Sequence, residues 1–189
     1  MYTTADLPIP SFACGETHDT PRLAAREGGL TLAKTLTVLN MFVPNGVPFI
    51  NSGQEVFETQ PMNTGLDARE NELFMLPEDD QFYGKLALFD KYQFHYTNPR
   101  RWELPDILDN LSTIRKSFLK QITNKETYLP IHMHEHPKTF IAFGYFKKGK
   151  ATKNNALLIL ANANPYHELY ARPNIEALRN ITGNKELQG

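Results

Sequence analysis

The fold is decided by a short apolar lead that runs directly into polar residues: Phe12-Ala13-Cys14-Gly15-Glu16-Thr17-His18-Asp19-Thr20-Pro21-Arg22. Its first part predicts a buried strand over 11–16, and His18 and Asp19 follow where that strand ends. In parallel βα architecture, the loops at the carboxyl ends of the strands converge on one face and carry functional groups. The stretch therefore places two polar side chains at the mouth of a buried strand.

A second segment of the same kind follows one helix later. The run Val47-Pro48-Phe49-Ile50-Asn51 predicts another buried strand, over 47–51, which leads into Ser52-Gly53-Gln54-Glu55. Between the two strands, apolar residues recur at helical spacing from about Leu30 until Pro44-Asn45-Gly46 ends the helix. We therefore expect two parallel βα units with their polar ends on one rim. That rim would carry His18, Asp19, Gln54 and Glu55.

The remaining sequence predicts one long helix and then a change to β structure. Pro105 and Asp106 open a helix over 105–122 with an apolar stripe at helical spacing. From Tyr128 the period becomes two, which predicts strands joined by polar turns. Residues 56–104 show no clean period, and a connection of that length favours a functional loop. The predicted strands cover 128–133, 139–146 and 156–163.

Together, these motifs resemble the last quarter of the α-amylase family, glycoside hydrolase family 13. The resemblance rests on the run from Thr17 to Arg22 followed by Gly46 to Glu55, and it covers roughly residues 10–165. It implies an α/β fold: the last two βα units and the closing helix of a (β/α)8 TIM barrel over 1–125. Part of an antiparallel β-sandwich domain would follow over 126–189. At one position, Thr17 stands where the family usually has Asn.

The resemblance implies a retaining glycosidase that acts on α-glucans such as starch, glycogen and maltooligosaccharides, without a cofactor. Asp19 matches the third essential carboxylate of the family, which helps to stabilise the oxocarbenium-like transition state, and His18 would bind the same sugar. The nucleophile and the acid/base carboxylate would lie on earlier barrel strands, outside these 189 residues. The chain alone is therefore expected to be inactive. Further candidates are Arg22, Asp67 and Arg69 for substrate binding, and Gln54 and Glu55 for support behind the site.

Several alternatives stay open at this point. Hydrolysis and glucosyl or maltosyl transfer use the same residues. An Asp before a helix is often an N-cap, and Arg22 is as well suited to brace the loop as to bind a ligand. The aromatic residues of the long connection, from Tyr83 to Trp102, are suited either to stack on sugars or to pin that loop.

From a different class, the alternative is a non-catalytic glucan-binding or metal-binding module. A metal-binding module would use His132, His134 and His136, which alternate along a predicted strand. Because no Cys or carboxylate stands at obvious ligand spacing, we expect exposed strand histidines and no metal site.

The composition narrows the range of partners. A net charge of -1 and 41% hydrophobic residues describe an ordinary globular chain with no bias toward nucleic acid or anionic membranes. No run of eighteen apolar residues predicts a transmembrane helix, and the lone Cys14 rules out an internal disulfide. The compartment stays open, with only a slight preference for the cytoplasm. Since two strands of an eight-stranded ring leave unpaired edges, we expect the remainder of the same enzyme or other copies to complete the barrel.

Overall fold

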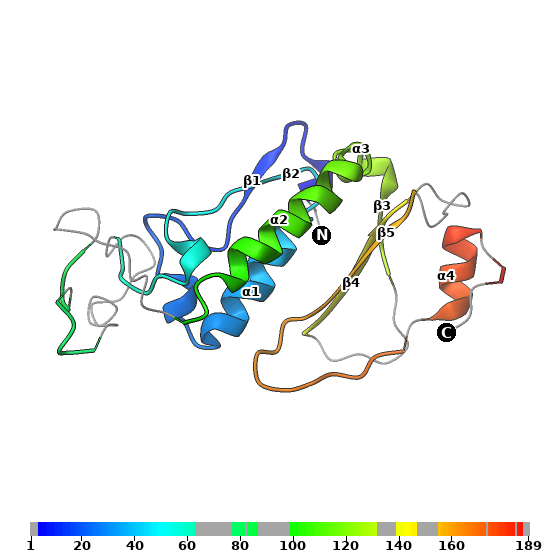
Figure 1. Ribbon diagram of the computed structural model, residues 1–189. Helices are drawn as coiled ribbons and strands as arrows, with labels where there is room; N and C mark the ends of the chain where they lie inside the picture. The colour runs from blue at the N-terminus through cyan, green and yellow to red at the C-terminus, as the bar shows by residue number, and fades with distance from the viewer. Residues whose placement is uncertain are drawn as a thin grey trace. The chain divides into compact units, whose positions relative to one another are not determined.

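The computed structural model describes residues 4–62, 77–81, 83–86, 99–131, 139–146, 155–172, 174–183 and 185–186. The chain divides into two compact units, one formed by Met1–Ala13, Met41–Pro48 and Ser112–Gly189 and the other by Cys14–Asn40 and Phe49–Leu111. Helices and strands are mixed along the chain (Figure 1). Both units draw on separate stretches of sequence, so neither ends at residue 125. The division implied by the family resemblance stays a prediction.

The first unit contains the two predicted parallel strands. β1 (Ser11–Ala13) pairs with β2 (Gly46–Pro48) in parallel, with Phe12 opposite Val47. This confirms both strands and their direction, although each is only three residues long. The predicted burial is wrong for this sheet: Phe12 is 75% exposed, and Val47 is exposed as well. A parallel sheet normally has both faces covered, and in the described residues this sheet has only these two strands.

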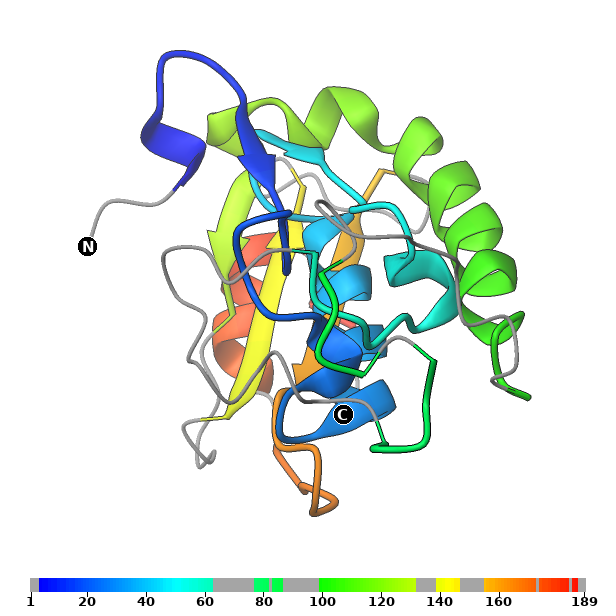
Figure 2. The same cartoon turned by 90° about the vertical axis from the view of Figure 1, so that its left-hand side faces the viewer.

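The first unit also contains an antiparallel sheet. It consists of β3 (Tyr128–Pro130), β4 (Phe140–Tyr145) and β5 (Leu157–Asn162), in that order, which confirms the three predicted strands. On one side lies the helix α4 (Ile175–Thr182), which the sequence analysis does not predict; its Leu178 packs with Ile131 and Phe146 (Figures 1 and 2). The unit also contains two short 3-10 turns, η1 (Thr4–Asp6) and η5 (Lys125–Thr127).

Tyr145 lies at the centre of the aromatic packing in this unit. Its side chain is fully buried, its hydroxyl donates to the carbonyl oxygen of Phe42 at 2.5 Å, and its ring meets that of Phe143 edge-on at 5.8 Å. Burial raises the pKa of Tyr145, because the phenolate would lose its hydration. Tyr128 raises that pKa further, while the guanidinium of Arg115 partly opposes the rise.

We expect Tyr145→Phe to change both the stability and its alkaline pH dependence. A raised folded-state pKa gives a stabilisation that is complete below about pH 10 and is lost as the pH rises further, because the unfolded phenol ionises first. The variant should lose about 1–3 kcal/mol at pH 7, since the Phe42 carbonyl keeps no partner there, and should show a weaker alkaline decline. Urea unfolding at pH 7 and pH 11 measures both effects. The control is Tyr170→Phe, at an 89% exposed ring, and an unchanged alkaline decline in Tyr145→Phe would contradict the expectation.

The second unit is built around two helices. α1 (Gly29–Asn40) confirms the predicted first helix, and the first turns of α2 (Glu103–Ser117) pack beside it (Figures 1 and 2). Their shared core consists of Leu23, Ala33, Phe57 and Leu104, with Ala24, Leu30, Leu36 and Leu108 partly buried around it.

The predicted helix 105–122 is divided in two. α2 is followed, after Phe118, by the short helix α3 (Leu119–Ile122). Phe118 leaves helical geometry, with φ -110° and ψ 13°, which explains the break. The predicted stripe is buried at Ile122, whereas Ile114 is exposed. No helix in the described residues is both long and apolar enough to span a membrane.

Candidate functional site

The candidate site lies in the second unit, in the loop that runs from Cys14 to η2 (Leu23–Ala25). His18 and Asp19 occupy a tight turn within this loop. The hydroxyl oxygen of Thr17 accepts a bond from the Asp19 amide at 3.2 Å, and that of Thr20 accepts one from the Thr17 amide at 2.8 Å. Hydroxyl side chains stabilise turns in this way. Thr17, the departure from the family pattern, therefore has a defined local role.

His18 and Asp19 are accessible and face one another. Nε2 of His18 lies 3.2 Å from Oδ2 of Asp19, and their side chains are 59% and 41% exposed. The N-cap alternative is not met at the helical turn that follows. Arg22 occupies the cap position of η2 without a side-chain cap bond, and the amide of Leu23 instead donates to a carboxylate oxygen of Glu16 at 2.6 Å. A more distant carboxylate thus satisfies that amide, and Asp19 stays at the surface of the turn.

A buried ion pair holds the loop in place. The carboxylate of Glu16 accepts a bond from Arg22 at 2.8 Å and another from the side-chain amide of Asn51 at 3.1 Å. Arg22 also donates to the carbonyl oxygens of Ser52, at 2.7 Å, and Gln60, at 2.9 Å. Because Asn51, Ser52 and Gln60 belong to the loop after β2, this ion pair ties the two strand-end loops to each other.

The placement of Arg22 favours one of its two proposed roles. Arg22 is only 1% exposed, and its guanidinium donates to Glu16, Ser52 and Gln60 of the same chain. A guanidinium in that position braces the loops and is not open to a substrate. Of the two roles left open by the sequence, the structure therefore favours the brace.

The loop after β2 is held by its own polar side chains. Gln54, in η3 (Gln54–Val56), donates to the hydroxyl of Thr37 on α1 at 2.7 Å and accepts a bond from the Asn51 amide at 3.3 Å. Glu55 accepts a bond from the amide of Gly53 at 2.8 Å. Gly53 has φ 95°, a conformation that glycine adopts without strain. Gln54 and Glu55 thus stabilise the loop backbone.

A pocket of about 330 Å³ lies next to the turn that carries the candidate pair. It is an open depression, and neither His18 nor Asp19 lines it. Its lining residues are Cys14, Gly15, Glu16, Thr17, Thr20, Pro21 and Arg26.

Some of the predicted site residues fall outside the described part of the chain. They include the substrate-binding candidates Asp67 and Arg69 and the histidines considered as metal ligands, His132, His134 and His136. Within the described residues, no group of three or more His, Cys, Asp or Glu side chains is arranged to hold a metal ion.

Two buried carboxylates are absent from the site residues predicted from the sequence. Glu16 is fully buried, as is Glu58, which accepts bonds from the amides of Thr59 and Gln60 at 2.8 Å each. One signal for Glu16 is present in the sequence, because it lies inside a predicted buried strand. A charge in that position requires a partner, and Arg22 stands six residues later.

Comparison with known proteins adds no family to this description. No protein-family model matches the chain, and a search of curated proteins finds no match.

Proposed function

We propose that this chain forms part of a retaining enzyme of the α-amylase family that acts on α-1,4-linked glucans. Asp19 would stabilise the transition state, and His18 would bind the same sugar ring. One observation carries the proposal: two parallel strands lead into loops that a buried ion pair fastens together, while His18 and Asp19 remain accessible on the turn. A carboxylate that stabilises a transition state must be accessible to the substrate, and the loop that carries it must be held rigidly in place.

The chemistry follows from the charge that develops on the sugar. In glycoside cleavage the ring becomes oxocarbenium-like, and hydrogen bonds from its hydroxyls strengthen in the transition state. The ionised carboxylate of Asp19 accepts such bonds, and His18 beside it contacts a neighbouring hydroxyl. Rigid support is valuable here, because a group that is already in position costs no reorganisation during the reaction. The same residues serve hydrolysis and sugar transfer alike.

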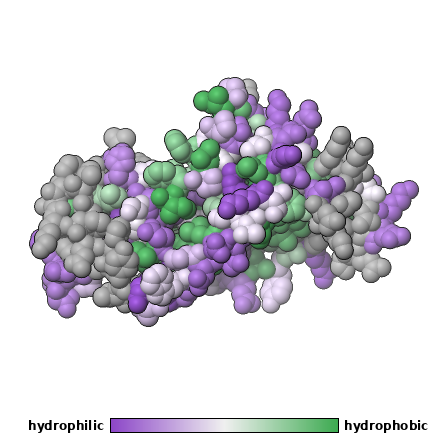
Figure 3. All heavy atoms as spheres, turned by 45° about the horizontal axis from the view of Figure 1, so that its top comes forward, coloured by the Kyte–Doolittle hydropathy of each residue, from purple (hydrophilic) through white to green (hydrophobic). Residues whose placement is uncertain are grey.

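The proposed enzyme would need further polypeptide to cover the β1–β2 sheet. Parallel sheets are normally covered on both faces, whereas the face of the β1–β2 sheet that carries Phe12 and Val47 is exposed. Apolar side chains also reach the surface among polar ones on the face drawn in Figure 3. The remainder of the enzyme, or other copies of the chain, would pair with these strands. The nucleophile and the acid/base carboxylate would come from the remainder of the enzyme.

We expect the 189-residue chain alone to show no turnover on starch or maltooligosaccharides, because in this proposal both of those carboxylates belong to the remainder of the enzyme. The complete enzyme should release its first product as the α-anomer, which proton NMR of the early reaction measures. A first product in the β-anomeric form would contradict the retaining mechanism. Turnover by the purified chain alone that disappears in Asp19→Asn would contradict the proposed division of the catalytic residues.

A further inference from the structure

The only tryptophan of the chain is exposed at the start of α2. Trp102 has 60% of its surface open to solvent, although indole is among the most costly groups to leave in water. The guanidinium of Arg101 lies 5.6 Å from the centroid of the indole ring, within the range of a cation–π contact. A hydrogen-bond donor thus lies over one face of this planar apolar surface, which is otherwise largely open to solvent.

The backbone beneath Trp102 is firmly anchored. Leu104, two residues later, is completely buried in the core of the second unit. Glu103 accepts bonds from both Arg100 and Lys34 of α1, and these cations hold the pKa of Glu103 at about 2, with Arg100 as the larger cause. The backbone that carries the indole is therefore held in position by its neighbours.

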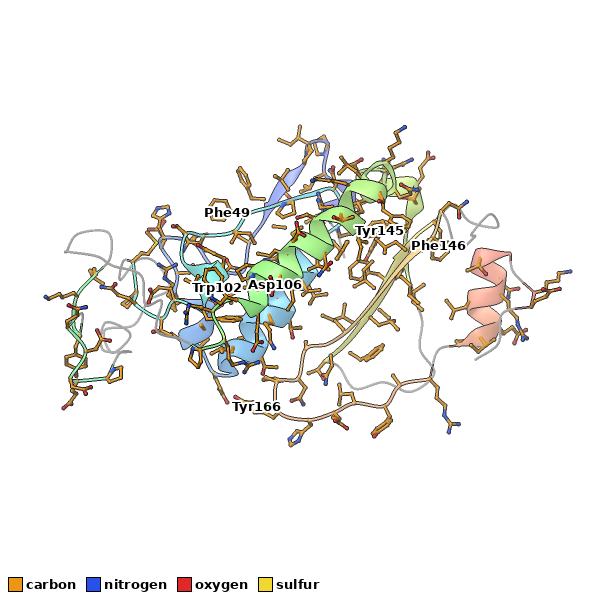
Figure 4. All side chains as sticks on the ribbon, viewed as in Figure 1. Phe49, Trp102, Asp106, Tyr145, Phe146 and Tyr166 are labelled. Atoms are coloured by element: carbon orange, nitrogen blue, oxygen red, sulfur yellow. The ribbon has the colours of Figure 1, made fainter. Side chains whose placement is uncertain are left out.

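An exposed carboxylate lies one helical turn further on. The amide of Asp106 donates to the carbonyl oxygen of Trp102 at 3.3 Å, so the two residues follow one another along the same side of the helix start (Figure 4). The Asp106 side chain is exposed and has no hydrogen bond or ion pair to any residue in the described part of the chain. The arrangement offers an apolar plane, a donor and a free acceptor within one turn.

From this arrangement we infer a glucan-binding site at Trp102, separate from Asp19, in which a glucosyl ring stacks on the indole while Arg101 and Asp106 bond its hydroxyls. A pyranose has one face of C–H groups and an equator of hydroxyls, which match a flat apolar ring flanked by a donor and an acceptor. A single exposed aromatic side chain is ordinary; the neighbouring donor and acceptor distinguish this one. The carboxylate of Asp106 disfavours an anionic ligand. The choice of an α-glucan rests on the proposed function.

Because Trp102 is the only tryptophan, its fluorescence reports directly on this site. We expect titration of the full 189-residue chain with maltoheptaose to give a saturable change, with half-saturation on the order of 1 mM, as suits one stacked ring and a few hydrogen bonds. Asp106→Asn should raise the half-saturation about five- to tenfold. The matched control Asp79→Asn, another exposed carboxylate of the same unit, should leave it unchanged.

Calorimetric titration extends the test to a chain without the indole. Trp102→Ala should abolish the binding heat, whereas Tyr170→Ala, at an 89% exposed ring, should retain it. No saturable fluorescence change with maltoheptaose would overturn the inference. Equal half-saturation with cellohexaose, a β-linked glucan, would overturn its assignment to α-glucans.

The experiments can distinguish failure of the Trp102 site from failure of the proposed function. Asp19→Asn should leave the fluorescence titration unchanged, because Asp19 belongs to a different loop. One outcome would refute only the Trp102 site: Asp19→Asn abolishes the turnover of the complete enzyme, but maltoheptaose causes no saturable fluorescence change. A positive titration with a complete protein that shows no α-glucan turnover would refute the catalytic proposal and leave the chain a glucan-binding module.

Discussion

Asp19→Asn lowers the turnover of the complete enzyme on an α-1,4-glucan by about 100- to 1000-fold or more, if Asp19 stabilises the transition state as proposed. The amide has nearly the same shape, but it lacks the negative charge that favours the oxocarbenium-like sugar. Since this interaction strengthens in the transition state, kcat should fall far more than KM changes. Steady-state kinetics on a maltooligosaccharide measure both parameters.

The variant should fold normally, which keeps the kinetic result interpretable. The Asp19 side chain is partly exposed, and the turn is held by the hydroxyls of Thr17 and Thr20. Its urea unfolding curve should therefore match that of the parent protein. Asp79→Asn, which removes an exposed carboxylate elsewhere in the same unit, should keep full activity. A near-normal kcat for Asp19→Asn would remove the catalytic assignment.

Arg22→Ala is expected to have the largest effect on stability, lowering the free energy of unfolding by about 3–5 kcal/mol. The substitution leaves the buried carboxylate of Glu16 without its cation and leaves the carbonyl oxygens of Ser52 and Gln60 without their donor. A loss of that size is a large share of the total stability of a typical domain. Urea denaturation with linear extrapolation measures it.

A matched control is provided by the partly exposed ion pair of Lys34 and Glu103, whose nitrogen and oxygen lie 3.0 Å apart. Lys34→Ala should cost less than about 1 kcal/mol, because water already screens that pair. Arg22→Lys should fall between the two, since an ammonium keeps the charge but lacks the planar fork that reaches several acceptors. If Arg22→Ala instead raised KM and left the unfolding curve unchanged, Arg22 would be a substrate-binding residue, as the resemblance implies.

The sequence predicts the elements well, because each depends on local periodicity. The two parallel strands, the helix between them and the three later strands all overlap their predicted ranges, although β2 shares only Val47 and Pro48 with the predicted 47–51, and α4 was not predicted. The predictions that fail are those that depend on long-range packing. Phe12 was predicted to be buried because it is apolar and on a strand, but its exposure depends on which neighbours cover the sheet. The helix break at Phe118 could not be predicted, because no Gly or Pro stands at that position to indicate it.

The candidate site, too, could be predicted from the sequence only where it depends on local features. His18 and Asp19 could be placed at a strand end from the sequence, and the structure brings them together on one accessible turn. The role of Arg22 could not be settled from the sequence, because its partners lie on a different loop. The Trp102 arrangement likewise depends on three-dimensional placement, since exposure and the position of a guanidinium have no periodic signature.

The ion pair of Glu16 and Arg22 also has a consequence for the order of folding. Arg22 bonds to groups six, 30 and 38 residues away along the chain, whereas the hydrogen bonds of α1 are local. Contacts between distant segments form later than local ones, because the intervening chain must first be closed into loops. The helices would then exist before the turn of His18 and Asp19 is fixed. During refolding, hydrogen exchange should protect the amide of Leu23, which is bonded to Glu16, only after the amides of α1.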